Sequence, residues 1–190
     1  MDGSRRQSRM VRPACAAALV LLGLVALGTA ASTAGAVPEA TVVGCKTESG
    51  TQIAATASYR FALRIVMAEK MYTPAEVQKK HLKHGEVMLR GSMSMGGMSM
   101  GGSMRHLEVQ ICAKKTGAVI TNANPTIVVV DNTAKMTTRV PIAVMEGIGE
   151  GVADLHYGNN VVMSVGHRYT ITVTLRGERA VFRVRLPKTV

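Results

Sequence analysis

The sequence contains no tryptophan, only four tyrosines and two phenylalanines, and only three cysteines among its 190 residues. Proteins that bind single-stranded nucleic acid stack the bases on aromatic side chains, and so few rings leave little for that purpose. The formal net charge is nevertheless +11. The basic residues are scattered along the chain, so we interpret this charge as a source of solubility and of attraction to anionic envelope surfaces. We expect no nucleic-acid partner.

The sequence also lacks an apolar run long enough to cross a bilayer. Its longest run, residues 14–28, is shorter than the roughly 20 residues that a spanning helix needs. Four arginines precede the run and the small residues Ala34-Gly35-Ala36 follow it, a pattern typical of a cleavable export signal. We expect residues 1–36 to be removed, although an uncleaved anchor is the alternative. The remaining chain would have a lead-in, residues 37–56, and one domain, residues 57–190, in the periplasm, at the cell envelope or secreted.

Cysteine usage agrees with export. Cys15 lies in the predicted signal, so Cys45 and Cys112 are the pair that remains. An even number of cysteines in an oxidising compartment predicts a disulfide. Copper ligation by the two thiolates is the alternative, which the absence of a Cys-x-x-Cys spacing disfavours.

Short segments of alternating apolar and polar residues predict an all-β fold. The Thr73-Pro74-Ala75-Glu76 segment is the exception, because it has the signature of a helix start, and we expect that helix to end near His84. Together these features indicate an immunoglobulin-like antiparallel β-sandwich with one short helix in a crossover. The predicted strands are residues 57–67, 86–90, 105–113, 125–131, 137–145 and 160–163, followed by a hairpin over residues 169–186, and residues 146–158 are predicted as a glycine-rich loop.

Residues 91–104 consist of methionine, glycine and serine, and we predict a flexible loop there. Thioether sulfur is a soft ligand that favours Cu(I), and it does not form disulfides. Low-complexity drift is the alternative explanation of this composition. The candidate accessory metal ligands in the segment are Met93, Met95, Met98, Met100 and Met104.

Two further segments carry residues that bind metals. His106 and Glu108 lie two positions apart on a predicted strand, so their side chains share one face, with Cα atoms about 6.6 Å apart. An imidazole and a carboxylate at that spacing can converge on one ion, although an exposed polar strand face would have the same pattern. His156 lies in the predicted glycine-rich loop, and Met145 shortly precedes that loop.

The motifs His106-Leu107-Glu108 and His156-Tyr157-Gly158-Asn159-Asn160-Val161, with the closing segment 168–173, resemble those of the periplasmic metal-binding proteins that accompany ferrous-iron permeases. The resemblance implies an immunoglobulin-like sandwich, commonly dimeric, with a copper- or iron-binding site. It implies His106, Glu108, Met145 and His156 as ligands, and a membrane permease or another metal acceptor as partner. Two features depart from the family: the gap between Met145 and His156 is longer, and the C-terminal histidine is missing.

The sequence therefore predicts an exported protein that captures copper or ferrous iron for uptake or handover at the cell envelope. No nucleophile–base constellation is recognisable, so we do not expect an enzyme. Two alternatives remain open. One is a methionine-rich copper-resistance carrier, in which the residue 91–104 segment alone holds the metal. The other is an adhesive or structural sandwich without a metal.

Overall fold

The computed structural model describes residues 45–84, 87–89 and 103–187, which belong to one compact unit, residues 40–190. The predicted export signal and the methionines at 93, 95, 98 and 100 lie outside the described residues. In the part of the chain that the structure describes, no helix is long and apolar enough to span a membrane.

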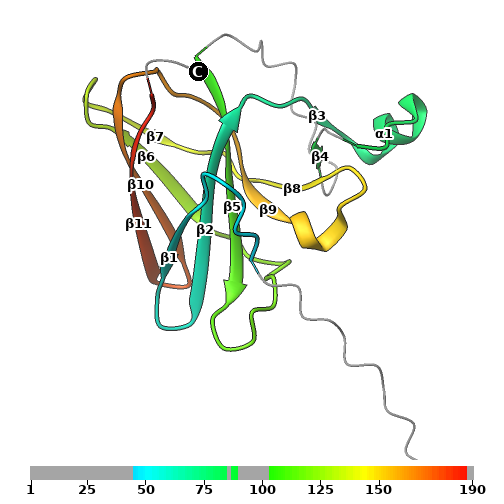
Figure 1. The fold of residues 1–190 in the computed structure, drawn as a ribbon, viewed down its shortest axis with the longest axis horizontal. Helices are drawn as coiled ribbons and strands as arrows, with labels where there is room; N and C mark the ends of the chain where they lie inside the picture. Colours follow the sequence, from blue (N-terminus) through cyan, green and yellow to red (C-terminus); the bar gives the residue numbers. More distant parts are fainter. Residues whose placement is uncertain (1–44, 85–86, 90–102, 188–190) are drawn as a thin grey trace, which may run out of the picture. The chain divides into compact units, whose positions relative to one another are not determined.

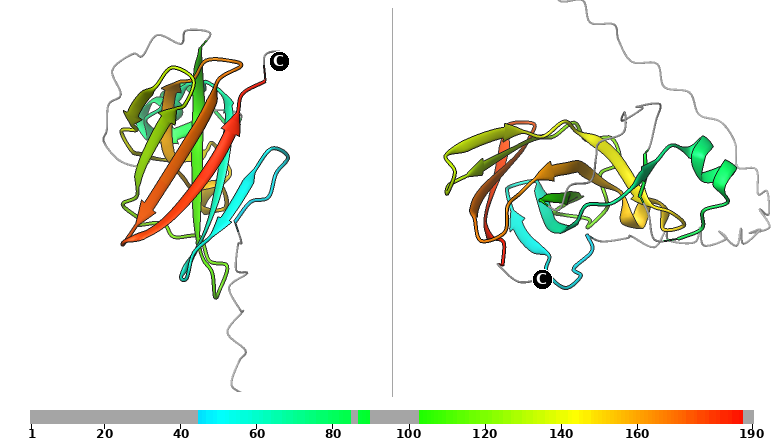
Figure 2. Two further views of the ribbon diagram at one scale, coloured as in Figure 1. Left: turned by 90° about the vertical axis from the view of Figure 1, so that its left-hand side faces the viewer. Right: turned by 90° about the horizontal axis from the view of Figure 1, so that it is seen from above.

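Two β-sheets face each other as layers (Figures 1 and 2), which confirms the predicted all-β sandwich. Every strand pair is antiparallel except β3–β4. The larger sheet has the order β1 (Gln52–Ala55), β2 (Tyr59–Met67), β5 (Met104–Ala113), β9 (His156–Val162), β8 (Ala143–Gly147), β4 (Val87–Leu89) and β3 (Met71–Tyr72). The smaller sheet has the order β11 (Glu178–Arg185), β10 (Arg168–Leu175), β6 (Thr126–Asp131) and β7 (Met136–Arg139).

The main core fills the space between the two sheets, because each sheet turns its apolar positions toward the other. Leu107 and Ile111 of the larger sheet and Ile171 and Phe182 of the smaller one belong to the same buried cluster. Burying a side chain of this size contributes about 1.5–3 kcal/mol. The β10–β11 hairpin, whose alternation is the most regular in the sequence, forms with its turn at Arg176 and Gly177, as predicted.

The helix α1 (Pro74–Lys80) begins as predicted and ends earlier. Thr73 accepts a hydrogen bond from the backbone of Glu76, and the Glu76 carboxylate accepts one from the backbone of Thr73. This reciprocal pair satisfies two amide groups at the start of the helix. His81 adopts the left-handed conformation with φ 55° and ends the helix, several residues before the predicted end near His84.

The predicted strand over residues 137–145 is wrong, because the chain changes sheets within it. β7 belongs to the smaller sheet and β8 to the larger, and Pro141 lies between them. Proline has no amide hydrogen to contribute to a ladder, so the continuous apolar pattern does not correspond to one strand. The short 3-10 helix η1 (Gly151–Asp154) follows β8 and leads into β9.

Candidate metal centre

The candidate site lies on the face of β5 that points away from the inter-sheet core. Leu107, Val109 and Ile111 face the core, so His106, Glu108 and Gln110 lie on the opposite face, as the alternation predicts. That face is not exposed: these three side chains are 0%, 9% and 6% accessible. An exposed polar strand face, the alternative considered from the sequence, is therefore wrong.

A segment before β1, residues 45–51, covers this face, and we call it the strap. A disulfide joins Cys45 of the strap to Cys112 of β5, as predicted from the cysteine count. The backbone amide of Lys46 also donates to the side chain of Gln110 over 2.6 Å. The strap is thus fixed to two side chains of the same strand face.

His106 and His156 meet although 50 positions separate them. Their Nε2 atoms lie 3.3 Å apart, with ring centroids 5.5 Å apart and ring planes at 85°. His156 is not in a loop, as the sequence suggested, but is the first residue of β9, the strand paired with β5. The pairing brings both imidazoles to the same face of the sheet.

The hydrogen bonds of the two Nδ1 atoms determine whether each Nε2 atom carries a hydrogen or presents a lone pair. His156 Nδ1 lies 2.7 Å from the backbone oxygen of Asp154, which can only accept. His106 Nδ1 lies 2.9 Å from Asn160 Oδ1. That oxygen also accepts the amide hydrogen of Glu69, while Asn160 Nδ2 donates to the oxygen of Glu69. Both Nδ1 atoms therefore carry the hydrogen, and both Nε2 atoms present lone pairs to each other.

Burial keeps both rings neutral at physiological pH. Burial, aided by the neighbouring His156, lowers the pKa of His106 to about 4. Burial also lowers the pKa of His156, since an imidazolium without water is costly. Two neutral rings with facing lone pairs repel each other unless a cation lies between them. Two nitrogen ligands bound to a tetrahedral ion at about 2.0–2.1 Å lie about 3.3–3.4 Å apart, close to the observed spacing.

Two carboxylates complete the cluster around His106. Ligand atoms of Glu69, His106 and Glu108 all lie within 4.8 Å of one another. Burial and the neighbouring Glu108 raise the pKa of Glu69 to about 7, and burial raises the pKa of Glu108. Two carboxylates without enough counter-charge hold protons that a metal ion can replace.

The sequence analysis missed Glu69. It follows the end of β2 and comes near His106 only because β2 pairs with β5, with Met67 opposite Arg105. No local spacing connects Glu69 to the His106-Leu107-Glu108 motif.

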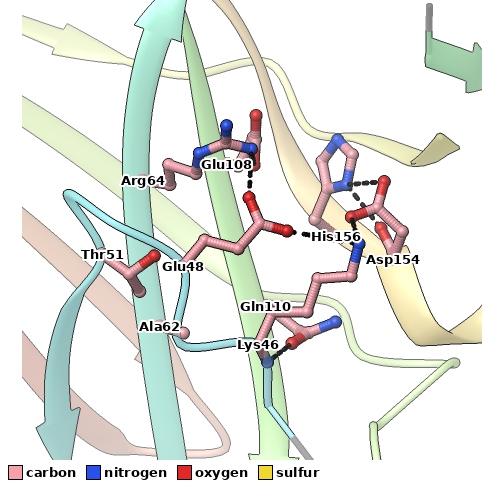
Figure 3. Close-up of a pocket in the computed structure, with 9 residues that line it drawn as sticks. All are labelled: Lys46, Glu48, Thr51, Ala62, Arg64, Glu108, Gln110, Asp154 and His156. Carbon is pink, nitrogen blue, oxygen red and sulfur yellow. Dashed lines mark hydrogen bonds and ion pairs between the residues drawn. The ribbon is translucent and has the colours of Figure 1, made fainter. Parts of the chain in front are cut away.

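The cluster opens to solvent through a pocket crossed by charged side chains (Figure 3). Lys46 of the strap lies 2.8 Å from Asp154, and Arg64 of β2 bridges Glu48 and Glu108 at 3.1 and 3.5 Å. Glu108 and His156, both buried, are among the residues that line this pocket. The ion pairs of Lys46 and Arg64 therefore lie in the same pocket as the exposed edges of Glu108 and His156.

The predicted methionine ligands have different positions. Met145 is fully buried and lies opposite His156 in the β8–β9 register, so it shares the face of the site. It belongs to a second small apolar cluster with Leu89 and Ala143. Met104 is not in a loop, as the sequence suggested, but is the buried first residue of β5, two positions before His106.

Gly158 allows β5 and β9 to approach closely in the middle of the site. A Cβ atom at this position would overlap the carbonyl oxygen of Leu107 and lie 2.9 Å from its carbonyl carbon. Gly158 pairs with Glu108 on one side and with Ala143 on the other. The residue between His156 and Asn160 on the site face therefore has no side chain, which leaves room for the imidazoles.

No protein-family description and no curated protein sequence matches the chain. Two solved structures have a similar arrangement. A DUF4426 family protein from Pseudomonas aeruginosa PAO1 is 14% identical, with a TM-score of 0.44 over 73% of this chain and 97% of that one. FetP of uropathogenic E. coli strain F11, expressed in the periplasm, is 13% identical, with a TM-score of 0.42 over 71% of this chain and 89% of that one. At these values neither similarity identifies a function.

Proposed function

We propose that this protein is an exported carrier that binds a copper or ferrous iron ion and hands it to a membrane permease or another acceptor. His106 and His156 would supply two imidazole nitrogens, and Glu108 and Glu69 would supply carboxylate oxygens. Met145 is a further candidate because of its register position opposite His156. Imidazole and carboxylate suit iron, copper and zinc, and a thioether would shift the preference toward Cu(I).

One observation carries the proposal: two buried, neutral imidazoles direct their Nε2 lone pairs at each other over 3.3 Å. A structural histidine pair would use one ring as donor and the other as acceptor. Here Asn160 and the backbone of Asp154 take both hydrogens away from the shared space. Such outer partners, which fix the tautomer, are typical of metal-binding histidines.

The carboxylates support the same interpretation. Glu69 and Glu108 lie together at the edge of a buried face, where their mutual repulsion is unfavourable without a cation. Arg64 alone forms an ion pair with Glu108 among the described residues. A divalent ion would neutralise both carboxylates, and the Arg64 and Lys46 ion pairs beside it would open for its release to an acceptor.

The test is to measure binding of Cu(II), Fe(II) and Zn(II) under anaerobic conditions to the wild type and to a His106→Ala/His156→Ala variant. We expect one tight site in the wild type and a loss of affinity of at least a thousandfold in the variant. His167→Ala is the matched control, because His167 bonds to Asp131 on the smaller sheet. The proposal is wrong if the double variant binds all three ions as tightly as the wild type.

The methionine-rich carrier remains the second candidate, and the same experiment separates the two. If Cu(II) binding survives in the double variant but is lost when residues 92–102 are deleted, the methionines hold the metal and the sandwich site does not.

A further inference from the structure

One end of the sandwich gathers several turns and strand ends, and we call it the β9–β10 end. Strand register defines it: Met104 at the start of β5 pairs with Val162 at the end of β9, and Arg105 pairs with Met67 at the end of β2. β9 leads directly into β10, where Arg168 pairs with Arg185 of β11. Figure 1 shows these segments together at the top of the view.

Exposed apolar side chains concentrate at this end. Seven large apolar residues are exposed in the part of the chain that the structure describes, and four of them lie here. They are Met67, Met136, Val162 and Val165, with 55%, 64%, 70% and 44% of their surface accessible. They come from the end of β2, the start of β7, the end of β9 and the β9–β10 turn. Single exposed apolar residues are ordinary, and these four form no continuous patch; what distinguishes them is that they share one end of the molecule.

The same end also carries unpaired positive charge. Arg168 and Arg185 lie directly opposite each other on β10 and β11, and Arg183 is two positions from Arg185 on the same face. Like charges in this arrangement destabilise a sheet. These three arginines and Lys135 line one open hollow, and no carboxylate forms an ion pair with any of them among the described residues.

The nearby carboxylate of Asp131 is engaged elsewhere. It accepts hydrogen bonds from His167 Nδ1 over 2.7 Å and from the backbone amides of Thr133 and Ala134 over 2.8 and 2.9 Å. Asp131 therefore stabilises the β6–β7 turn and does not neutralise the arginines. The hollow retains a net positive charge.

We infer that the β9–β10 end docks on an anionic phospholipid surface. Guanidinium groups match phosphate geometry through paired hydrogen bonds, and cations near an anionic leaflet each add to the attraction. Apolar side chains on separate turns can each enter the headgroup region, as in proteins that lie on membranes. An acidic protein partner would match the arginines. A protein interface, however, usually buries one continuous apolar patch, and the four apolar side chains of this end lie apart from one another.

This inference does not depend on the metal site and holds for the protein with or without an ion. Membrane docking would nevertheless complement the proposed metal carrier. Met104 begins β5 at this end, and His106 lies only two positions further along the strand. Docking would bring the candidate metal site to the side of the molecule nearest the membrane.

The test is co-sedimentation of the purified protein with phospholipid vesicles. The protein is used in the form that accumulates in expressing cells. One set contains phosphatidylcholine alone and the other contains 30% phosphatidylglycerol. We expect binding to the second set only, weakening as salt rises. With about a fivefold contribution from each cation, Arg168→Gln/Arg183→Gln/Arg185→Gln should weaken binding by about a hundredfold.

The matched control removes three arginines from the opposite end of the sandwich, as Arg60→Gln/Arg176→Gln/Arg179→Gln. It changes the net charge equally and should weaken binding less than tenfold. A second variant, Met136→Ser/Val165→Ser, keeps the charge and should reduce the binding that persists at high salt. Absence of wild-type binding to the anionic vesicles, or an equal loss in the control triple variant, would overturn the inference. Inorganic phosphate binding without vesicle binding would also overturn it, as it would indicate a small-anion site.

Discussion

Asn160 is the residue whose replacement tests the organisation of the metal site most directly. Its side chain holds the His106 ring through Oδ1 and the backbone of Glu69 through both Oδ1 and Nδ2. Asn160→Ala removes all three hydrogen bonds while leaving every proposed ligand in the chain. At about 1 kcal/mol of net stability per bond, the free energy of unfolding should fall by about 3 kcal/mol.

The same substitution should weaken metal binding without removing a ligand. Without Asn160, nothing holds the hydrogen of His106 on Nδ1, so the tautomer that offers Nε2 is no longer favoured. The loop that carries Glu69 also loses its attachment to β9. Loss of such an outer partner typically costs about 10–100-fold in metal affinity. Urea denaturation of the metal-free protein and competition titration with a chelator measure the two effects.

Asn159 provides the control for this experiment. It is equally buried and lies next to Asn160, but its side chain faces the other way and donates to the backbone oxygen of Pro141 over 2.9 Å. Asn159→Ala removes this bond and the one that Asn159 Oδ1 accepts from the backbone amide of Asn160 over 2.8 Å. It should therefore lower the free energy of unfolding by about 2 kcal/mol and leave metal affinity within about threefold of the wild type. Equal losses of affinity in the two variants, or none in Asn160→Ala, would refute the role assigned to the Asn160 side chain.

Three other predictions concern the disulfide, the carboxylates and the methionine-rich segment. A Cys45→Ser/Cys112→Ser variant should lose about 4 kcal/mol of unfolding free energy on the chain-entropy account of a long closed loop, as measured by urea denaturation. The Glu69 carboxyl has its pKa raised to about 7, so it is protonated below that pH and competes with metal there. Wild-type affinity should therefore rise between pH 6 and pH 8, and Glu69→Gln should flatten this rise; a parallel profile would contradict the role of Glu69. Deleting residues 92–102 should lower the Cu(I) stoichiometry and leave Cu(II) affinity unchanged, and a loss of Cu(II) binding would place the metal on the methionines.

The sequence predicted those parts of the fold that depend on local pattern. The β10–β11 hairpin alternates from Tyr169 to Arg185 with Val181 as the one apolar exception, and the start of α1 carries a complete capping box, so both were predictable. The single strand expected over residues 137–145 failed because a run of apolar residues continues through Pro141. Periodicity does not reveal that the two halves belong to different sheets.

The candidate site was predictable only where its residues share a strand. His106 and Glu108 lie two apart, so alternation alone places them on one face. The burial of that face depends on the strap, which the disulfide between Cys45 and Cys112 holds in place. These cysteines are 67 positions apart, so no local pattern reveals that the strap covers the face. Glu69 and Asn160 are linked to each other across 91 positions, which explains why neither was predicted to have a role in the site.

The disulfide between the strap and β5 also determines when the site can be completed. Until Cys45 and Cys112 are joined, the bond that anchors Lys46 and Glu48 over the polar face of β5 is missing. Thiols stay reduced in the cytoplasm and are oxidised outside it. For the exported carrier proposed above, a chain still inside the cell would therefore have its strap held only by hydrogen bonds and ion pairs, and oxidation after export would complete the cover of the cluster. Such an order would give the proposed carrier its fully covered site only in the compartment where it works.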